Sequence, residues 1–248
     1  MICILKKLGR NMTLDIAMHR SLLIHILRDI YADSSISSLL GFKGGTAAYL
    51  FYNLARFSVD LDFDLLDLSS EDLVFEKLKN ILAEYGLVVE ARKKRYCFFY
   101  LLAYNNKVQN AYNIKVEINR RNFGSHYEVK SYLGIPMKVM VKEDMAAHKF
   151  VAMFERIGKT NRDIFDVWFF LKNNWPINEK IIESRTGMSL QQFFQKCIDE
   201  LEARGDRGIL SGIGELLDAK QKAWAREKLR SETIFLLKLR LESLQISE

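Results

Sequence analysis

The chain has 248 residues, of which 49% are hydrophobic and 27% are charged, and its formal net charge is +6. This length and apolar content allow a sizeable core, in one large domain or two modest ones, and they exclude an intrinsically disordered chain. The three cysteines are widely spaced without a CxxC pair, which excludes a disulfide framework and a structural zinc site and fits a reducing cytoplasm. The basic balance permits binding to a polyanion but does not demonstrate it.

No stretch of about 18 apolar residues runs without a charge, so we expect no membrane-spanning helix. The apolar run at residues 2–5 is too short for a signal peptide, and we expect a cytoplasmic protein. Residues 1–11 are a candidate extension, because Met12 is an alternative start.

Apolar periodicity predicts an α+β part over residues 1–141 and a helical domain over residues 142–248. In chain order, the first part is predicted to contain a helix over 13–31, a helix over 46–55, a strand over 57–66, a helix over 70–85 and strands over 87–93, 96–104, 112–119 and 137–141. A turn is predicted at Asn105-Asn106. The second part is predicted to contain helices over 142–156, 162–172, 189–204 and 213–245.

The predicted strand over 57–66 alternates strictly between acidic or polar and apolar residues. Asp60, Asp62 and Asp64 therefore share one face, where neighbouring carboxylates lie about 7 Å apart and repel one another. A divalent cation makes such a cluster favourable, and magnesium takes one or two carboxylates together with water and phosphate oxygens. The alternative is a solvent-facing strand whose polar side is acidic.

Two further features support a phosphate and metal site. Gly44-Gly45 precedes a predicted helix, and such a pair lets the backbone approach phosphate oxygens at the helix N-terminus. Glu117 alternates with apolar residues on a strand that we expect beside the Asp60 strand, so it is the best candidate for a third carboxylate. The alternative for Glu117 is a surface position on an edge strand.

The stretch Gly44-Gly45-Thr46, a helix, and then Arg56 to Phe63 (RFSVDLDF) resembles the AbiEii/MenT family of nucleotidyltransferase toxins, which have the DNA polymerase beta-like fold. Lys149 resembles the lysine of this family, and Arg162 to Asp166 (RDIFD) resembles its Arg-Asp-x-x-Asp signature. The resemblance covers about residues 13–172.

The resemblance implies a role for each matching residue. Asp60 and Asp62 are expected to hold magnesium or manganese, and Glu117 to complete a second metal position or to activate the acceptor hydroxyl. Asp163 is expected to face the site, whereas for Asp166 we favour a salt bridge that joins two helices. The residues expected to contact the triphosphate are Lys43, Gly44, Gly45, Thr46, Ser58 and Lys149.

The resemblance also implies a function. The expected enzyme moves a nucleoside monophosphate from a nucleoside triphosphate to RNA, with tRNA as the acceptor in some relatives, and a cognate antitoxin opposes it. Two alternatives remain. One is transfer to a protein or a small molecule such as an antibiotic, and the other is a nucleotide- or RNA-binding module without catalysis.

Overall fold

The computed structural model describes residues 15–104 and 113–246. The candidate extension at residues 1–11 and the predicted turn at Asn105-Asn106 lie outside these ranges. Within them, no helix combines the length and the apolar character needed to cross a membrane.

A mixed sheet forms the centre of the molecule, and its strands follow the order β3-β4-β5-β2-β1-β7-β6. The strands are β1 (Leu40–Lys43), β2 (Leu61–Leu65), β3 (Leu87–Lys93), β4 (Cys97–Ala103), β5 (Asn113–Asn119), β6 (Tyr127–Tyr132) and β7 (Ile135–Met140). The β2/β5 and β1/β7 pairs are parallel, and the other pairs are antiparallel. Strand β2, with its acidic residues, therefore lies in the middle of the sheet between β5 and β1.

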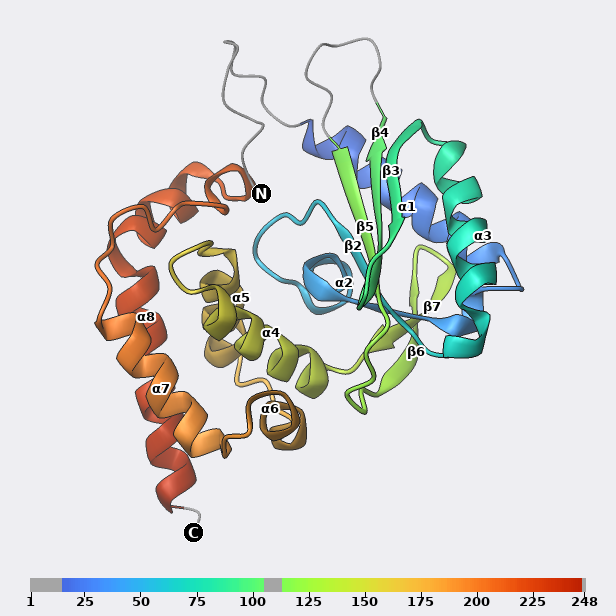
Figure 1. Cartoon of the computed structure of the whole chain (residues 1–248). Helices are drawn as coiled ribbons and strands as arrows, with labels where there is room; N and C mark the ends of the chain where they lie inside the picture. The colour runs from blue at the N-terminus through green and yellow to red at the C-terminus, as the bar shows by residue number, and fades with distance from the viewer. Residues whose placement is uncertain (1–14, 105–112, 247–248) are drawn as a thin grey trace.

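Figure 1 shows α1 and α3 on one side of the sheet and α4, α5, α7 and α8 on the other. The helices are α1 (Ile16–Ala32), α2 (Gly44–Tyr52), α3 (Glu71–Ala83), α4 (Lys142–Arg156), α5 (Arg162–Lys172), α6 (Glu179–Thr186), α7 (Leu190–Glu202) and α8 (Ala219–Ile246). One hydrophobic core runs through both parts of the chain, from Leu23 on α1 to Leu237 on α8. The predicted α+β fold with a mixed sheet and a helical remainder is confirmed.

Two element predictions need correction, and three elements were missed. The strand predicted over 57–66 begins only at Leu61, because Phe57 and Ser58 are buried and the Phe57 N–H donates to the Leu216 carbonyl in the helical part. The helix predicted from residue 213 begins at Ala219, after a short 3₁₀ turn. The missed elements are strand β1, strand β6 and helix α6. The division of the chain at residue 141 stays a prediction.

Candidate functional site

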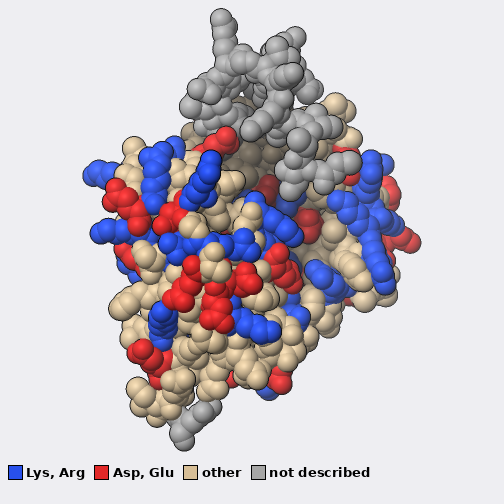
Figure 2. Space-filling view, turned by 60° about the vertical axis from the view of Figure 1, so that its left-hand side comes forward, with Lys and Arg blue, Asp and Glu red and all other residues tan. Residues whose placement is uncertain are grey.

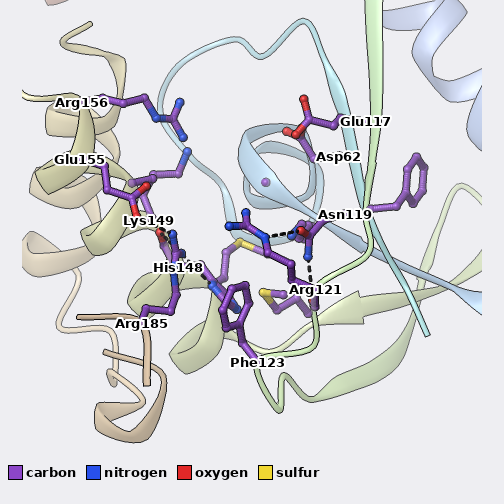
Figure 3. A pocket seen from close by; sticks show the side chains of 16 residues that line it. Asp62, Glu117, Asn119, Arg121, Phe123, His148, Lys149, Glu155, Arg156 and Arg185 are labelled. Carbon is purple, nitrogen blue, oxygen red and sulfur yellow. Dashed lines mark hydrogen bonds and ion pairs between the residues drawn. The ribbon is translucent and has the colours of Figure 1, made fainter. Parts of the chain in front are cut away.

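The candidate site lies where the middle of the sheet faces helix α4. Asp62 on β2 and Glu117 on β5 are directly paired across these two parallel strands. Both side chains line a pocket between the sheet and α4, and Figure 3 shows them on the wall opposite Lys149 and Arg156. The Glu117 side chain is 38% exposed, so its carboxylate is accessible from the pocket. Strand pairing thus brings together two acids that are 55 positions apart in the sequence (117 − 62 = 55).

Asp60 directly precedes β2, and two basic side chains neutralise it. Arg162 Nη1 lies 3.4 Å and Lys115 Nζ lies 3.9 Å from Asp60 Oδ2. Lys115 Nζ is also 3.8 Å from Glu117 Oε2, so this lysine lies between the two acids. Burial opposes the charge of Lys115, but Asp62, Asp60 and Glu117 outweigh it and raise the pKa of the lysine above its usual value.

The sequence reading missed Lys115, although a signal for it existed. Lys115 precedes Glu117 by two positions, so the period of two places both side chains on one face of β5. A lysine beside clustered acids supplies the positive charge that the cluster requires.

The oxygen-rich donor set of this site fits magnesium or manganese, which prefer carboxylate and water ligands. Across residues 15–104 and 113–246, no three acidic, histidine or cysteine side chains lie close enough to hold a metal ion together. Magnesium does not need three, because waters and substrate phosphates supply its other ligands. Asp62 and Glu117 are the candidate protein ligands that line the pocket, and metal binding by the full set of Asp60, Asp62 and Glu117 stays a prediction.

Asp64 follows the same spacing, yet its surroundings differ. Its carboxylate accepts hydrogen bonds from Lys43 Nζ at 2.6 Å, from Asn119 Nδ2 at 2.7 Å and from the Tyr127 hydroxyl. Donors within the protein therefore satisfy this buried acid. Lys43, which the resemblance implies as a phosphate contact, lines the pocket and pairs with Asp64.

The two glycines at the start of α2 allow close packing, of Gly44 against Asp62 and of Gly45 against Ser58 and Arg56. Gly44 has a φ of +78°, and an added Cβ would lie less than 3.0 Å from the Asp62 carboxylate. An added Cβ at Gly45 would lie 2.8 Å from Ser58 Oγ. Gly44 also lines the pocket, so the first residue of α2 borders the space beside Asp62, and a helix N-terminus is a favourable neighbour for a phosphate.

Thr46 and Ser58 lie behind these glycines and are buried. The Thr46 hydroxyl donates to the Asp60 carbonyl and lies 3.0 Å from Ser58 Oγ. Both side chains thus hold the backbone of Asp60 in place, and neither lines the pocket. Their predicted contact with the triphosphate stays a prediction.

Lys149 projects from α4 between two buried carboxylates of α5. Its Nζ lies 3.0 Å from Asp163 Oδ1 and 3.0 Å from Asp166 Oδ2. Asp166 also accepts two bonds from the Arg56 guanidinium, at 2.5 and 2.6 Å. Asp166 therefore forms the predicted ion pair between helices, and it additionally fixes the segment that leads to Ser58.

Asp163 is buried behind Lys149 and does not line the pocket. Burial favours the neutral acid, but Lys149 and Arg156 outweigh it and lower the pKa of Asp163 to about 2. Its Oδ2 lies 3.3 Å from Arg156 Nη1 without forming a hydrogen bond. In this arrangement Asp163 positions Lys149, and its expected place facing the site stays a prediction.

The far wall of the pocket is basic and was not predicted. Arg121, after β5, projects toward the centre in Figure 3, and Arg156 and Arg185 approach from the helical part. The guanidinium groups of Arg121 and Arg185 lie 5.3 and 5.2 Å, respectively, from the ring centre of Phe123. No sequence pattern joins these residues, because they come from three separate segments. The wall offers positive charge and an aromatic ring opposite the acids, which suits a nucleotide.

Acids on the central strands of a mixed sheet, next to a helix that begins with two glycines, are typical of nucleotidyltransferases with the polymerase beta-like fold. The family model described as nucleotidyl transferase AbiEii toxin, type IV TA system, matches residues 25–233. The chain therefore belongs to the AbiEii family and is a nucleotidyltransferase. Membership implies a nucleoside triphosphate as donor and an antitoxin as protein partner.

Solved structures of low sequence identity share the fold. A protein from H. pylori described as a nucleotidyltransferase has a TM-score of 0.61 and 22% identity, over 96% of this chain and 99% of that chain. JHP933 from Helicobacter pylori has a TM-score of 0.58 and 22% identity, over 96% and 97%. MenT4, a nucleotidyltransferase toxin from Mycobacterium tuberculosis, has a TM-score of 0.57 and 21% identity, over 93% and 95%. No curated protein matches the sequence.

Proposed function

We propose that the protein transfers a nucleoside monophosphate from a nucleoside triphosphate to a hydroxyl group of RNA, with tRNA as the expected acceptor. The reaction depends on magnesium or manganese, takes place in the cytoplasm and is opposed by an antitoxin. The observation that supports this best is the direct pairing of Asp62 with Glu117 beside Gly44 in one pocket. That pocket combines two metal-binding carboxylates with a helix N-terminus suited to phosphate.

In this reaction the acceptor oxygen attacks the α-phosphorus, and a new phosphorus–oxygen bond forms. The bond from the α-phosphorus to the oxygen bridging to the β-phosphate breaks, and pyrophosphate leaves with that bonding pair. Glu117, facing the pocket, accepts the hydroxyl proton directly or through water. A metal ion held by Asp62 with Asp60 and Glu117 would neutralise charge on the triphosphate and on the leaving pyrophosphate.

Lys149 and Arg156 supply positive charge from the opposite wall. Asp163 and Asp166 hold Lys149 in one direction, each at 3.0 Å, while 14% of the lysine side chain stays exposed. An ammonium group held in advance stabilises developing negative charge without reorganising during the reaction. Positioning and electrostatics therefore account for the catalysis expected of phosphoryl-group transfer.

The proposal is tested by incubating the purified protein with magnesium, each α-labelled nucleoside triphosphate in turn, and unfractionated bacterial tRNA. We expect label in tRNA with the wild type and its loss in Asp60→Asn/Asp62→Asn, whose circular dichroism should stay native. The matched control is Glu76→Gln/Glu84→Gln, which neutralises two exposed acids on the other side of the sheet, one on α3 and one at its C-terminal cap.

Three outcomes would contradict parts of the proposal. Transfer retained by the Asn double variant would rule out the metal-binding role of these acids. Label found in protein or in an aminoglycoside instead of tRNA would replace the acceptor. Nucleotide binding without pyrophosphate release would indicate a binding module.

A further inference from the structure

A second groove reaches the acids on the side of the helical domain. Its lining residues differ entirely from those of the first pocket: Val59, Arg162, Leu210, Gly212, Ile213, Gly214, Glu215, Leu216, Lys222 and Arg226. Its volume of about 580 Å³ is within the range of ligand sites. Arg162 connects the groove to the reaction centre, because its Nη1 lies 3.4 Å from Asp60 Oδ2.

The groove carries two positive charges that are unpaired within the described part of the chain. Lys222 and Arg226 lie one helical turn apart at the start of α8, so they project along the same face. Within residues 15–104 and 113–246, neither side chain has an ion-pair partner, in contrast to Lys149, Lys115 and Arg162. The lining includes one acid, Glu215, which is exposed at the surface.

The basic surface continues beyond this groove. An adjoining hollow shares the loop over residues 208–211 and is lined by Lys159, Arg204 and Arg207. The start of α5 holds this loop, since the Asn161 N–H donates to the Ser211 carbonyl and Asn161 Nδ2 to the Gly208 carbonyl. Figure 2 shows a hollow with acidic side chains in it and Lys and Arg side chains on both of its sides. The cations thus extend over two neighbouring hollows.

Arg204 pairs with Glu200, whereas no ion-pair partner among the described residues belongs to Lys159, Arg207, Lys222 or Arg226. Such a spread-out row of cations matches a chain of phosphates better than it matches a single nucleotide. RNA carries one phosphate per residue, and each contact with Lys or Arg releases a counterion and adds affinity. In-line transfer also requires the acceptor to approach the α-phosphorus opposite the leaving pyrophosphate. If the triphosphate occupies the first pocket, beside Gly44 and Lys149, a separate entrance remains for the acceptor.

We infer that the groove between α8 and the loop over 210–216 guides the RNA acceptor to Asp60. Lys222 and Arg226 contact backbone phosphates next to the nucleotide that accepts the transfer, and Lys159 and Arg207 contact phosphates further along the strand. This assignment deepens the proposed function and rests on it.

The test compares Lys222→Gln/Arg226→Gln with Lys220→Gln/Lys228→Gln, a control that removes the same charge from exposed positions of α8 outside the groove. Binding of labelled tRNA is measured by fluorescence anisotropy over a series of salt concentrations, and transfer is measured as KM for tRNA and for the nucleotide. For the groove variant we expect at least about a tenfold weaker tRNA affinity and a salt dependence reduced by about two counterions. Its KM for the nucleotide should stay as in the wild type.

A charge-conserving variant, Lys222→Arg/Arg226→Lys, should restore tRNA affinity, which separates loss of charge from loss of folding. Equal tRNA affinities of the groove and control variants would overturn the groove assignment. Transfer to tRNA by the wild type would still support the proposed function in that case. A rise confined to the KM for the nucleotide would overturn it too, because the groove would then hold the donor. If the wild type binds tRNA through the groove but transfers nothing to it, the proposed function fails and the groove assignment stands. No tRNA binding by the wild type would overturn both.

Discussion

At the residue scale, the most demanding feature is the buried pair of Arg56 and Asp166. Their side chains are 1% and 0% exposed, and the guanidinium group also donates to the Phe57 carbonyl at 2.9 Å. Moving two charges out of water is expensive, and only a complete set of partners offsets the cost. A variant that removes Arg56 leaves the buried Asp166 carboxylate with Lys149 as its remaining cation, which Asp166 shares with Asp163.

We expect Arg56→Met to lower the free energy of unfolding by about 3–5 kcal/mol, the range for breaking a buried ion pair. Arg92→Met is the control, because Arg92 pairs with Glu90 on β3 while its side chain is 72% exposed. Such an exposed pair contributes at most about 1 kcal/mol. Urea denaturation of both variants measures how much free energy of unfolding each one loses. Equal losses would show that the buried Arg56 pair stabilises the protein no more than the exposed Arg92 pair.

At the same scale, the sequence could identify some site residues and not others. The period of two selects Asp60, Asp62 and Glu117 as candidate acids, but it selects Asp64 equally. What separates Asp64 from Asp62 is the set of donors from three other segments, Lys43, Asn119 and Tyr127, which no local pattern contains.

At the scale of elements, the start of α2 combines a strained backbone with close packing against an acid. A residue other than glycine pays for a positive φ in its backbone, and at Gly44 its Cβ would also push against Asp62. Gly134, between β6 and β7, has a similar φ of +81° but nothing within 4 Å of an added Cβ. The two glycines therefore separate backbone strain from displacement of the carboxylate.

We expect Gly44→Ala and Gly134→Ala to lose similar stability, on the order of 1 kcal/mol, from the positive φ alone. Only Gly44→Ala should reduce transfer, by about 100-fold, because a shift of about 1 Å in a catalytic group has such an effect. Thermal unfolding and initial rates of nucleotide transfer measure the two quantities. If both variants transfer at the wild-type rate, then the contact of Gly44 with Asp62 has no catalytic importance.

Two of the three elements missed from the sequence share a physical cause. Strand β6 is an edge strand whose Val129 is 70% exposed, so its apolar residues do not follow a buried face. Helix α6 has only eight residues and two buried ones, Ile181 and Ile182, which is too little for a helical period. The long and strongly periodic elements, such as α4 and β5, were predicted nearly to the residue. Tertiary packing decides the remainder.

At the scale of the whole molecule, His148 joins the sheet part of the chain to its helices. From α4, its Nε2–H donates to Ser125 Oγ at 2.7 Å, and its Nδ1 accepts from Arg185 Nη1 of α6 at 3.1 Å. Accepting from an arginine requires an unprotonated Nδ1, so the neutral ring is the form that fits. Burial and the charge of Lys43 lower the pKa of His148 to about 3, and Asp64 and Asp144 oppose this only in part.

Because the pKa of His148 in the folded chain lies below its unfolded value of 6.5, the free energy of unfolding depends on pH, and the sign of this effect is fixed. Above pH 6.5 the ring is neutral in both states, and the stability is fully present. As the pH falls from 6.5 toward 3, the unfolded chain binds a proton that the folded chain does not, so the stability decreases. At pH 5 the loss from His148 is about 2 kcal/mol. Burial likewise lowers the pKa of His19, which adds a loss of the same sign.

We therefore expect the free energy of unfolding to fall between pH 7 and pH 5, and to fall less in His148→Gln by about 2 kcal/mol. Glutamine keeps an amide donor and acceptor but does not titrate, so the variant isolates protonation of the ring from loss of polar contacts. His25→Gln is the control, because His25 is exposed on α1. Urea denaturation at several pH values gives the slopes. If the free energy of unfolding falls with pH equally steeply in His148→Gln and His25→Gln, then the His148 ring titrates alike in the folded and unfolded chains. Contacts other than this histidine would then determine how the sheet and the helices separate in acid.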